Sequence, residues 1–302
     1  MTTTLFGRLP SARSSVAALA LLALAAAIAL APPAAHAQPQ RSTQLPRVSP
    51  NAAVSQTVGV TDVHITYGRP SVNDRDIFGG LVPYGEVWRT GANEATTITV
   101  SNDVQIEGQS LKAGTYGFFT VPGRETWTLI FNETAEQWGA YEYDQSQDAL
   151  RVEVEPQEAP HPHEQMGFHF GSVTDSSATA ALVWDETRVP FRIETNTSAH
   201  VRTRAEAAAE NAEDWRAPLR YAAYALENDL YPEAALDWVN RSMALAENFQ
   251  NTALKARLLA SMERYEDARR LAERAMTRAE EGNGTPQGLE QFEEQVAGWP
   301  SR

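Results

Sequence analysis

The sequence has no cysteine and almost no lysine. Without cysteine, disulfide bonds, thiolate chemistry and a lipid anchor on cysteine are excluded, so stability must come from packing. Lysine occurs only at Lys112 and Lys255, and arginine supplies the rest of the basic charge. Acidic residues outnumber basic ones by 39 to 25, and the formal net charge of −14 opposes binding to nucleic acid or to anionic lipid surfaces. No nucleic-acid partner is expected.

The motifs of several common catalytic chemistries are also missing. The sequence contains no Gly-x-Ser-x-Gly elbow, no His-Glu-x-x-His pair and no phosphate-binding loop. No cofactor is expected. Catalysis is left open, with a non-catalytic role favoured.

The first 37 residues have the pattern of a cleavable signal peptide. Arg8 and Arg13 precede an apolar run over residues 16–30, and small residues at positions 35 and 37 fit a signal peptidase site. The apolar run is shorter than the about 20 residues that cross a membrane. We therefore expect cleavage near Ala37, a mature chain beginning at Gln38 that is periplasmic or secreted, and no membrane insertion after cleavage.

Beyond the signal peptide, the hydrophobic pattern predicts a β domain. Residues 38–56 are polar and contain prolines, which is typical of a flexible lead-in. Apolar residues then alternate with polar ones in about nine or ten short runs, separated by turn residues. The pattern predicts a β-sandwich or jelly-roll-like domain over residues 57–196. The alternation includes residues 63–67, 98–106, 116–120, 127–131, 150–154, 166–170, 180–184 and 189–193.

A helical pattern follows over residues 199–298. The sequence from Tyr231 to Ala234 recurs from Tyr265 to Ala268, an offset of 34 residues, and Ala222 stands the same distance before Ala256. This is the period of tetratricopeptide repeats, which place small residues at helix crossings. The tail is therefore predicted to be tetratricopeptide-like and to pack on the β domain or on a partner. A plain helical bundle with coincidental spacing is the alternative.

The densest polar and aromatic segment links two predicted strands and supplies the candidate ligand-binding residues. Long loops on a rigid β scaffold often carry binding or catalytic groups. Arg89 is suited to a carboxylate or sulfate, Trp88 to stacking on a ring, and Glu94 to accepting a proton or a sugar hydroxyl. Alternatively, Arg69, Arg89, Asp76 and Glu94 pair with each other and hold the loop. The candidates are Tyr67, Arg69, Arg75, Asp76, Trp88, Arg89, Asn93 and Glu94.

Three strings in this region resemble a known family. They are RPSVNDRDIFGGLVPYGEVWRTGANEATTI from residue 69, LKAGTYGFFTVPGRETWTLIFN from residue 111 and WGAYEYD from residue 138. They resemble the secreted bacterial family called domain of unknown function 2911 over residues 57 to about 195. The resemblance implies no particular activity. The stretch EAPHPH at 158–163 departs from the family's usual linker.

Histidines are a weaker source of candidate ligands. His161, His163 and His169 lie close together in the sequence, so a zinc or copper site is conceivable, although their spacing matches no standard motif. His161 and His163 are expected in a solvated loop, and His169 on the face of a strand opposite Met166 and Phe168. No metal site is predicted.

Two functional hypotheses remain. The first is a non-catalytic exported module that binds a small molecule or glycan through the 69–96 loop, or a protein through its helical tail. The second is a hydrolase or lyase acting on a polysaccharide or small ester, with Glu94 or Asp76 as acid or base and Arg89 as charge stabiliser. Any two of Asp76, Glu86 and Glu94 could form a carboxylate pair, but the sequence does not give their separation.

Overall fold

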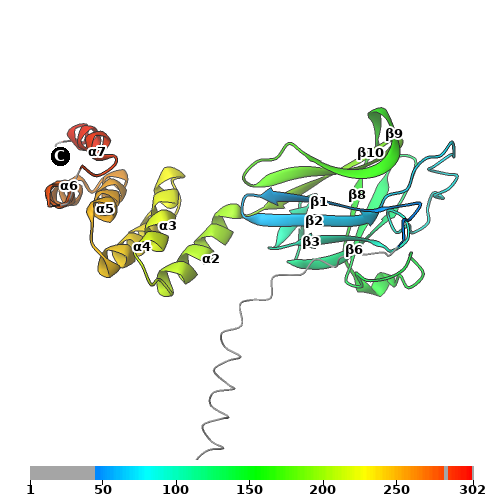
Figure 1. Ribbon diagram of the computed structural model, residues 1–302, viewed down its shortest axis with the longest axis horizontal. Helices are drawn as coiled ribbons and strands as arrows, with labels where there is room; N and C mark the ends of the chain where they lie inside the picture. The colour runs from blue at the N-terminus through cyan, green and yellow to red at the C-terminus, as the bar shows by residue number, and fades with distance from the viewer. Residues whose placement is uncertain (1–44, 282–284, 301–302) are drawn as a thin grey trace, which may run out of the picture. The chain divides into compact units, whose positions relative to one another are not determined.

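The computed structural model describes residues 45–281 and 285–300, which contain ten strands and six α-helices (Figure 1). The predicted signal peptide and residues 38–44 of the predicted lead-in lie outside the described residues. The strands are β1 (Asn51–Val58), β2 (Thr61–Gly68), β3 (Thr96–Val100), β4 (Val104–Ile106), β5 (Gln109–Leu111), β6 (Gly114–Val121), β7 (Trp127–Asn132), β8 (Asp148–Val154), β9 (Gln157–Gly171) and β10 (Ser177–Thr195), with a 3-10 helix at Gln145–Gln147.

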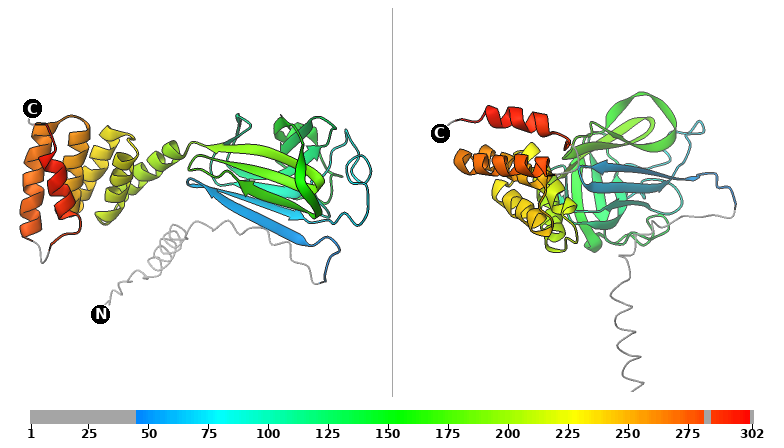
Figure 2. Two further views of the ribbon diagram at one scale, coloured as in Figure 1. Left: turned by 90° about the horizontal axis from the view of Figure 1, so that it is seen from above. Right: turned by 60° about the vertical axis from the view of Figure 1, so that its left-hand side comes forward.

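The strands form two antiparallel sheets. One sheet has six strands in the order β1-β2-β3-β6-β7-β8, and the other has four in the order β5-β4-β10-β9. They lie as two layers (Figures 1 and 2) and share one hydrophobic core. The ring of Phe118 on β6, for example, lies 5.6 Å from that of Phe191 on β10 and 6.0 Å from that of Phe168 on β9. The predicted fold class, a β domain followed by a helical tail, is confirmed.

The β domain begins earlier than predicted. Residues 51–56 were expected to belong to a flexible lead-in, but they form most of β1, which pairs with β2 from Asn51 to Val58. Most side chains of β1 are exposed or half-buried. This strand is therefore held mainly by main-chain hydrogen bonds to β2, an interaction that leaves little hydrophobic pattern in the sequence.

Strands β9 and β10 are much longer than the predicted runs. The EAPHPH stretch was expected to be a loop, but it lies within β9, an edge strand where proline is tolerated because one side needs no hydrogen-bond donor. Two predicted strands, 180–184 and 189–193, are parts of β10. Register shifts on either side of Asp185 interrupt the ladder, and Asp185 has a φ of +53°. These bulges break the alternation and made one strand resemble two.

The helical tail contains α2 (Thr197–Glu210), α3 (Arg216–Glu227), α4 (Pro232–Leu245), α5 (Phe249–Ser261), α6 (Tyr265–Glu280) and α7 (Leu289–Ala297). Helix α3 packs on α4, and α5 packs on α6. Ala222, Ala256 and Ala268 are completely buried, whereas Ala234 is only half-buried. The tetratricopeptide-like character of the tail stays a prediction. Within the described part of the chain, no helix is both long and apolar enough to cross a membrane.

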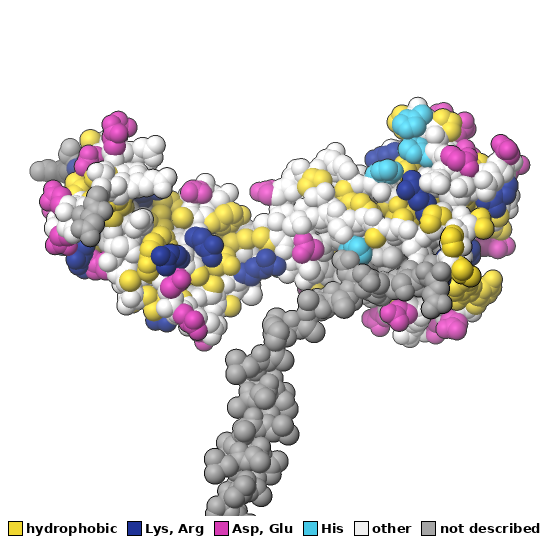
Figure 3. All heavy atoms as spheres, in the orientation of Figure 1, with side chains coloured by type: hydrophobic (Ala, Val, Ile, Leu, Met, Phe, Trp, Pro, Cys, Tyr) yellow, Lys and Arg dark blue, Asp and Glu magenta, His cyan; other side chains and the backbone are white. Residues whose placement is uncertain are grey.

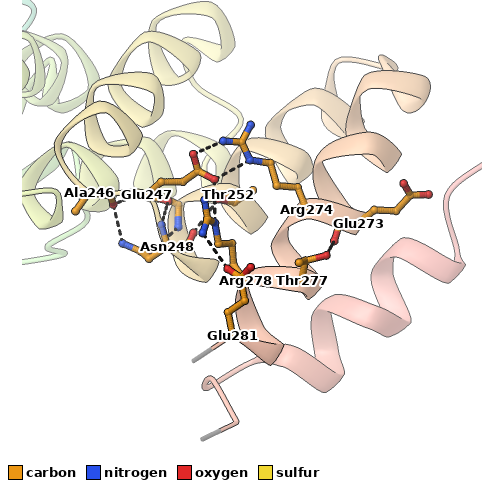
Figure 4. A network of polar contacts seen from close by, with 10 residues as sticks. Ala246, Glu247, Asn248, Thr252, Glu273, Arg274, Thr277, Arg278 and Glu281 are labelled. Atoms are coloured by element: carbon orange, nitrogen blue, oxygen red, sulfur yellow. Dashed lines mark hydrogen bonds and ion pairs between the residues drawn. The ribbon is translucent and has the colours of Figure 1, made fainter. Parts of the chain in front are cut away.

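An ionic cluster joins the turn between α4 and α5 to helix α6 (Figure 4). Arg274 donates two hydrogen bonds to the carboxylate of Glu247, one of them at 2.7 Å, and Arg278 donates a third at 3.3 Å. Burial alone would raise the pKa of Glu247, but the two arginines outweigh this effect and lower it. Glu247 is thus ionised and shared between two guanidinium groups on successive turns of α6.

We expect Ala268→Leu to destabilise the protein by roughly 1–3 kcal/mol, because a larger side chain overpacks a fully buried position. Ala207→Leu is the matched control, since Ala207 is exposed on α2 and its replacement should change stability by no more than about 0.5 kcal/mol. Urea unfolding of both variants measures the difference. A neutral Ala268→Leu would show that no close helix crossing exists there.

We expect Glu247→Gln to lower the free energy of unfolding by about 1 kcal/mol at neutral pH, a modest loss because the arginines are half-exposed and solvent screens them. The pKa of Glu247 is lower in the folded protein than in the unfolded chain, so its ionised carboxylate stabilises the fold at any pH above its pKa in the unfolded chain. This stabilisation is lost as the pH falls through the pKa of Glu247 in the folded protein. The difference between wild type and variant should therefore shrink in acid. Glu281→Gln, which removes one bond from an exposed carboxylate, is the control.

Candidate functional site

The segment between β2 and β3 carries seven of the eight candidate ligand-binding residues, and Tyr67 lies in β2 itself. The segment is irregular, but it is attached to three other parts of the β domain by isolated antiparallel bridges. These bridges pair Ser71 with Gln165, Trp88 with Thr120, and Glu94 with Trp138. The candidates are therefore distributed along a segment that crosses several strands.

Two of the candidates belong to the hydrophobic core. Trp88 is 8% exposed and stacks on Trp184, with ring centroids 5.9 Å apart and an interplanar angle of 17°. Phe78 packs edge-on against Trp127 at 4.9 Å and completes this four-ring cluster. Tyr67 is also buried, and its hydroxyl accepts a main-chain hydrogen bond from β9. Neither Trp88 nor Tyr67 presents a ring face for a ligand to stack on.

Arg75 and Asp76 lie in an exposed turn. The Arg75 guanidinium donates hydrogen bonds to the carbonyl oxygens of Ser71 (2.6 Å) and Val72 (2.9 Å). The main-chain oxygen of Asp76 accepts a hydrogen bond from Leu81 at 2.9 Å. The Arg75 side chain thus stabilises the local fold of this turn.

Arg69 lies near His169. We call His161, His163 and His169 the histidine patch, and Figure 3 shows histidine side chains gathered on one part of the β domain. The rings of His161 and His163 stack at 4.5 Å, and His169 lies 6.0 Å from His163. Burial lowers the pKa of His169, and the positive charges of His163 and Arg69 lower it further. In the described residues, no group of three or more His, Cys, Asp or Glu side chains is arranged to hold a metal ion.

Arg89 forms a second surface with residues of the segment that follows β7. The Nε of Arg89 is buried and has no hydrogen-bond partner, and the same is true of the Oε1 of Gln137. Trp138 and Tyr141 lie in the same segment and are 56% and 85% exposed. Burial lowers the pKa of Arg89, while the Tyr141 phenol opposes this shift. We call Arg89, Gln137, Trp138 and Tyr141 the Arg89 surface.

Asn93 and Glu94 connect the segment that contains Arg89 to the segment that follows β7. Glu94 is bridged to Trp138, and the Gly139 amide donates to the Asn93 oxygen at 3.0 Å. The Asn93 side chain donates to the Ser49 oxygen at 3.1 Å. The strings WRTGANEAT and WGAYEYD therefore meet in space. Asn93 contributes mainly to the backbone arrangement that supports Arg89.

The backbone next to Arg89 is strained. Thr90 and Asn93 have φ values of +55° and +64°, and this region is unfavourable for a β-branched residue such as threonine. The conformation is held by a hydrogen bond from the Thr90 hydroxyl to that of Thr120 (3.1 Å) and by another from the Thr96 hydroxyl to the Thr90 oxygen (2.7 Å). Strained conformations of this kind cluster at functional sites.

The alternative, in which Arg69, Arg89, Asp76 and Glu94 pair with each other and hold the loop, stays a prediction. Among the described residues, neither Arg69 nor Arg89 belongs to an ion pair of the kind that joins Arg151 to Asp148. Glu94 has an interaction of its own.

A small cavity of about 290 Å³ near the aromatic cluster was missed by the sequence reasoning. It is lined by Phe78, Tyr84, Arg124, Trp127, Glu158 and Glu186, among others. Arg124 lies over the ring of Tyr84, 4.8 Å from its centroid. Gln137, Trp138 and Tyr141 were also missed as candidates. None of these three residues belongs to a periodic pattern. The sequence could have identified them only by their position in or beside the strings that resemble a family.

We expect Trp88→Ala to destabilise the protein by about 3–5 kcal/mol, the usual cost of removing a large core aromatic. Trp138→Ala, at a position that is 56% exposed, should cost much less. Urea unfolding compares the two. Equal losses would show that Trp88 does not hold the loop in the core.

The comparisons with known proteins concern the β domain. A family model described as a protein of unknown function, DUF2911, matches residues 49–193, which include β1 to β9 and most of β10. No curated protein and no solved structure matches the chain. All eight candidate residues and the whole Arg89 surface fall within the matched range. The resemblance seen in the sequence is confirmed over the β domain, whose residues 49–193 match the DUF2911 family model.

Proposed function

We propose that the protein is an exported, non-catalytic module that binds an acidic glycan or sugar acid at the Arg89 surface. The observation that carries this proposal is the Arg89 guanidinium, whose buried Nε has no hydrogen-bond partner among the described residues. The exposed Tyr141 lies close enough to act on its charge, and the exposed Trp138 belongs to the same segment as Tyr141. Export is supported by the pattern of residues 1–37, which predicts a signal peptide and a periplasmic or secreted protein.

The first argument is electrostatic. A cation that is partly removed from water is unfavourable unless an anion or hydrogen-bond acceptors compensate it. Burial lowers the pKa of Arg89, and no carboxylate pairs with it in the described chain. A ligand carboxylate would accept hydrogen bonds from this guanidinium and remove the imbalance, because the planar fork matches a carboxylate.

The second argument concerns the rings. Trp138 and Tyr141 are among the most exposed large apolar side chains of the described residues. Aromatic rings with one polar end are suited to stacking on a sugar ring while a neighbouring group hydrogen-bonds its substituents. A guanidinium and two exposed rings together suit a sugar that carries a carboxylate.

The third argument concerns the kind of groups at the site. Around Arg89, the groups are a guanidinium and ring faces. Such groups bind and orient a ligand.

Titration of the full mature chain with oligosaccharides of a hexuronic acid tests the proposal. We expect Arg89→Gln to weaken the Kd by about 10- to 100-fold, because charge-assisted hydrogen bonds contribute about 1.5–3 kcal/mol. The melting temperature should stay unchanged or rise, since no ion pair is lost. Arg75→Gln is the matched control, because Arg75 bonds only to its own turn among the described residues.

A neutral oligosaccharide of the same length controls for stacking alone. The proposal is wrong if the acidic and neutral sugars bind equally, or if Arg89→Gln binds as tightly as the wild type. A clear fall in the melting temperature of Arg89→Gln would instead assign this arginine to the structure of the loop.

A further inference from the structure

Helices α4, α5 and α6 enclose a groove with a volume of about 490 Å³. Its apolar part comes from three leucines, one from each helix: Leu271 is half-buried, whereas Leu236 and Leu259 are 7% and 3% exposed and form the floor. Asn240 on α4 adds an amide. The volume is in the range that holds several side chains of a ligand.

The rim of this groove is strongly basic. Its lining contains Lys255, Arg264, Arg270 and Arg274 against a single carboxylate, Asp267. Positive charge is therefore concentrated here in a chain whose formal net charge is −14. Local charge of this kind attracts ligands of the opposite sign whatever the sign of the whole protein.

The internal partners do not neutralise the rim. Asp267 is shared between Arg264, at 3.0 Å, and Arg270, and Arg274 is held by Glu247 outside the groove. Lys255 is half-buried on α5 and has no ion pair in the described part of the chain. Lys255 therefore adds to the excess of basic side chains over the single carboxylate of this groove.

We infer that this groove binds a short acidic segment of a partner protein, with carboxylates at Lys255 and Arg270 and an apolar side chain against the leucines. An acidic peptide fits both parts of the groove, because it combines spaced carboxylates with apolar side chains. Nucleic acid fits less well, since its dense phosphates are repelled by the acidic remainder of the chain. The site is separate from the Arg89 surface and does not rest on it.

Fluorescence anisotropy with the full mature chain tests this inference. The probe is a fluorescein-labelled peptide that alternates glutamate with leucine, and the control peptide has glutamine in place of glutamate. We expect the acidic peptide to bind, the control peptide to fail, and affinity to fall as salt is raised. Lys255→Gln should weaken binding by about tenfold or more.

Arg257→Gln is the matched control, because Arg257 lies on the same helix but lines a different groove, so the charge change is identical. It should leave the affinity within about twofold of wild type. Arg270→Gln, at a side chain that is 69% exposed, provides a second variant that should fold and bind weakly. Melting curves show whether each variant is folded.

Three outcomes would overturn the inference. They are no binding of the acidic peptide, equal loss from Lys255→Gln and Arg257→Gln, or tighter binding of single-stranded DNA than of the peptide. The Arg89→Gln variant should bind the acidic peptide like wild type. If the Arg89 surface fails to bind acidic sugars, the peptide test is unaffected. If the groove fails to bind the acidic peptide, the sugar proposal is unaffected.

Discussion

The packing of Trp88 on Trp184 is the contact on which the arrangement of the site depends. Trp88 comes from the irregular segment, Trp184 from β10 and Trp127 from β7, so the cluster connects that segment to both sheets. Trp88 also exchanges two main-chain hydrogen bonds with Thr120, at 2.8 and 2.9 Å. Ring packing and this short ladder together fix the backbone of a segment that has no regular secondary structure over most of its length. Hydrogen bonds of Thr90 and Asn93 then fix the residues that follow.

Charge is distributed unevenly over a chain that is acidic as a whole. In the helical tail, most arginines of α6 are engaged by Glu247, Asp267 or Glu281, and the remaining excess lies in the groove beside Lys255. In the β domain, Arg89 has no such partner among the residues that the structure describes. Exposed ion pairs contribute little stability. The excess positive charge at Arg89 and in the groove beside Lys255 is therefore better explained by the binding of an anionic ligand, as proposed above, than by a contribution to stability.

The fold was predictable from the sequence where one face of a strand is buried. The alternation around Ile65, Phe118 and Leu129 identified β2, β6 and β7, because burial of every second side chain leaves a period of two. It failed for β1, which is held by main-chain pairing, and for β9 and β10, where prolines and bulges hide the period. The candidate site was predicted as a segment but not residue by residue. In a segment without a period, nothing distinguishes a buried Trp88 from an exposed Trp138.

The positions of Trp88 and Arg89 have a common cause. Successive side chains of extended backbone point to opposite faces, so a tryptophan that enters the core directs the next residue away from it. The hydrogen bond from Thr96 to the Arg89 oxygen, at 3.0 Å, fixes the chain beyond this point, and the strained Thr90 turns it toward β3. The aromatic core can thus supply the free energy that keeps an unpaired arginine and an unfavourable backbone in place. The side chain of Arg89 is thus positioned by residues that belong to the core, and not by ionic partners of its own among the described residues.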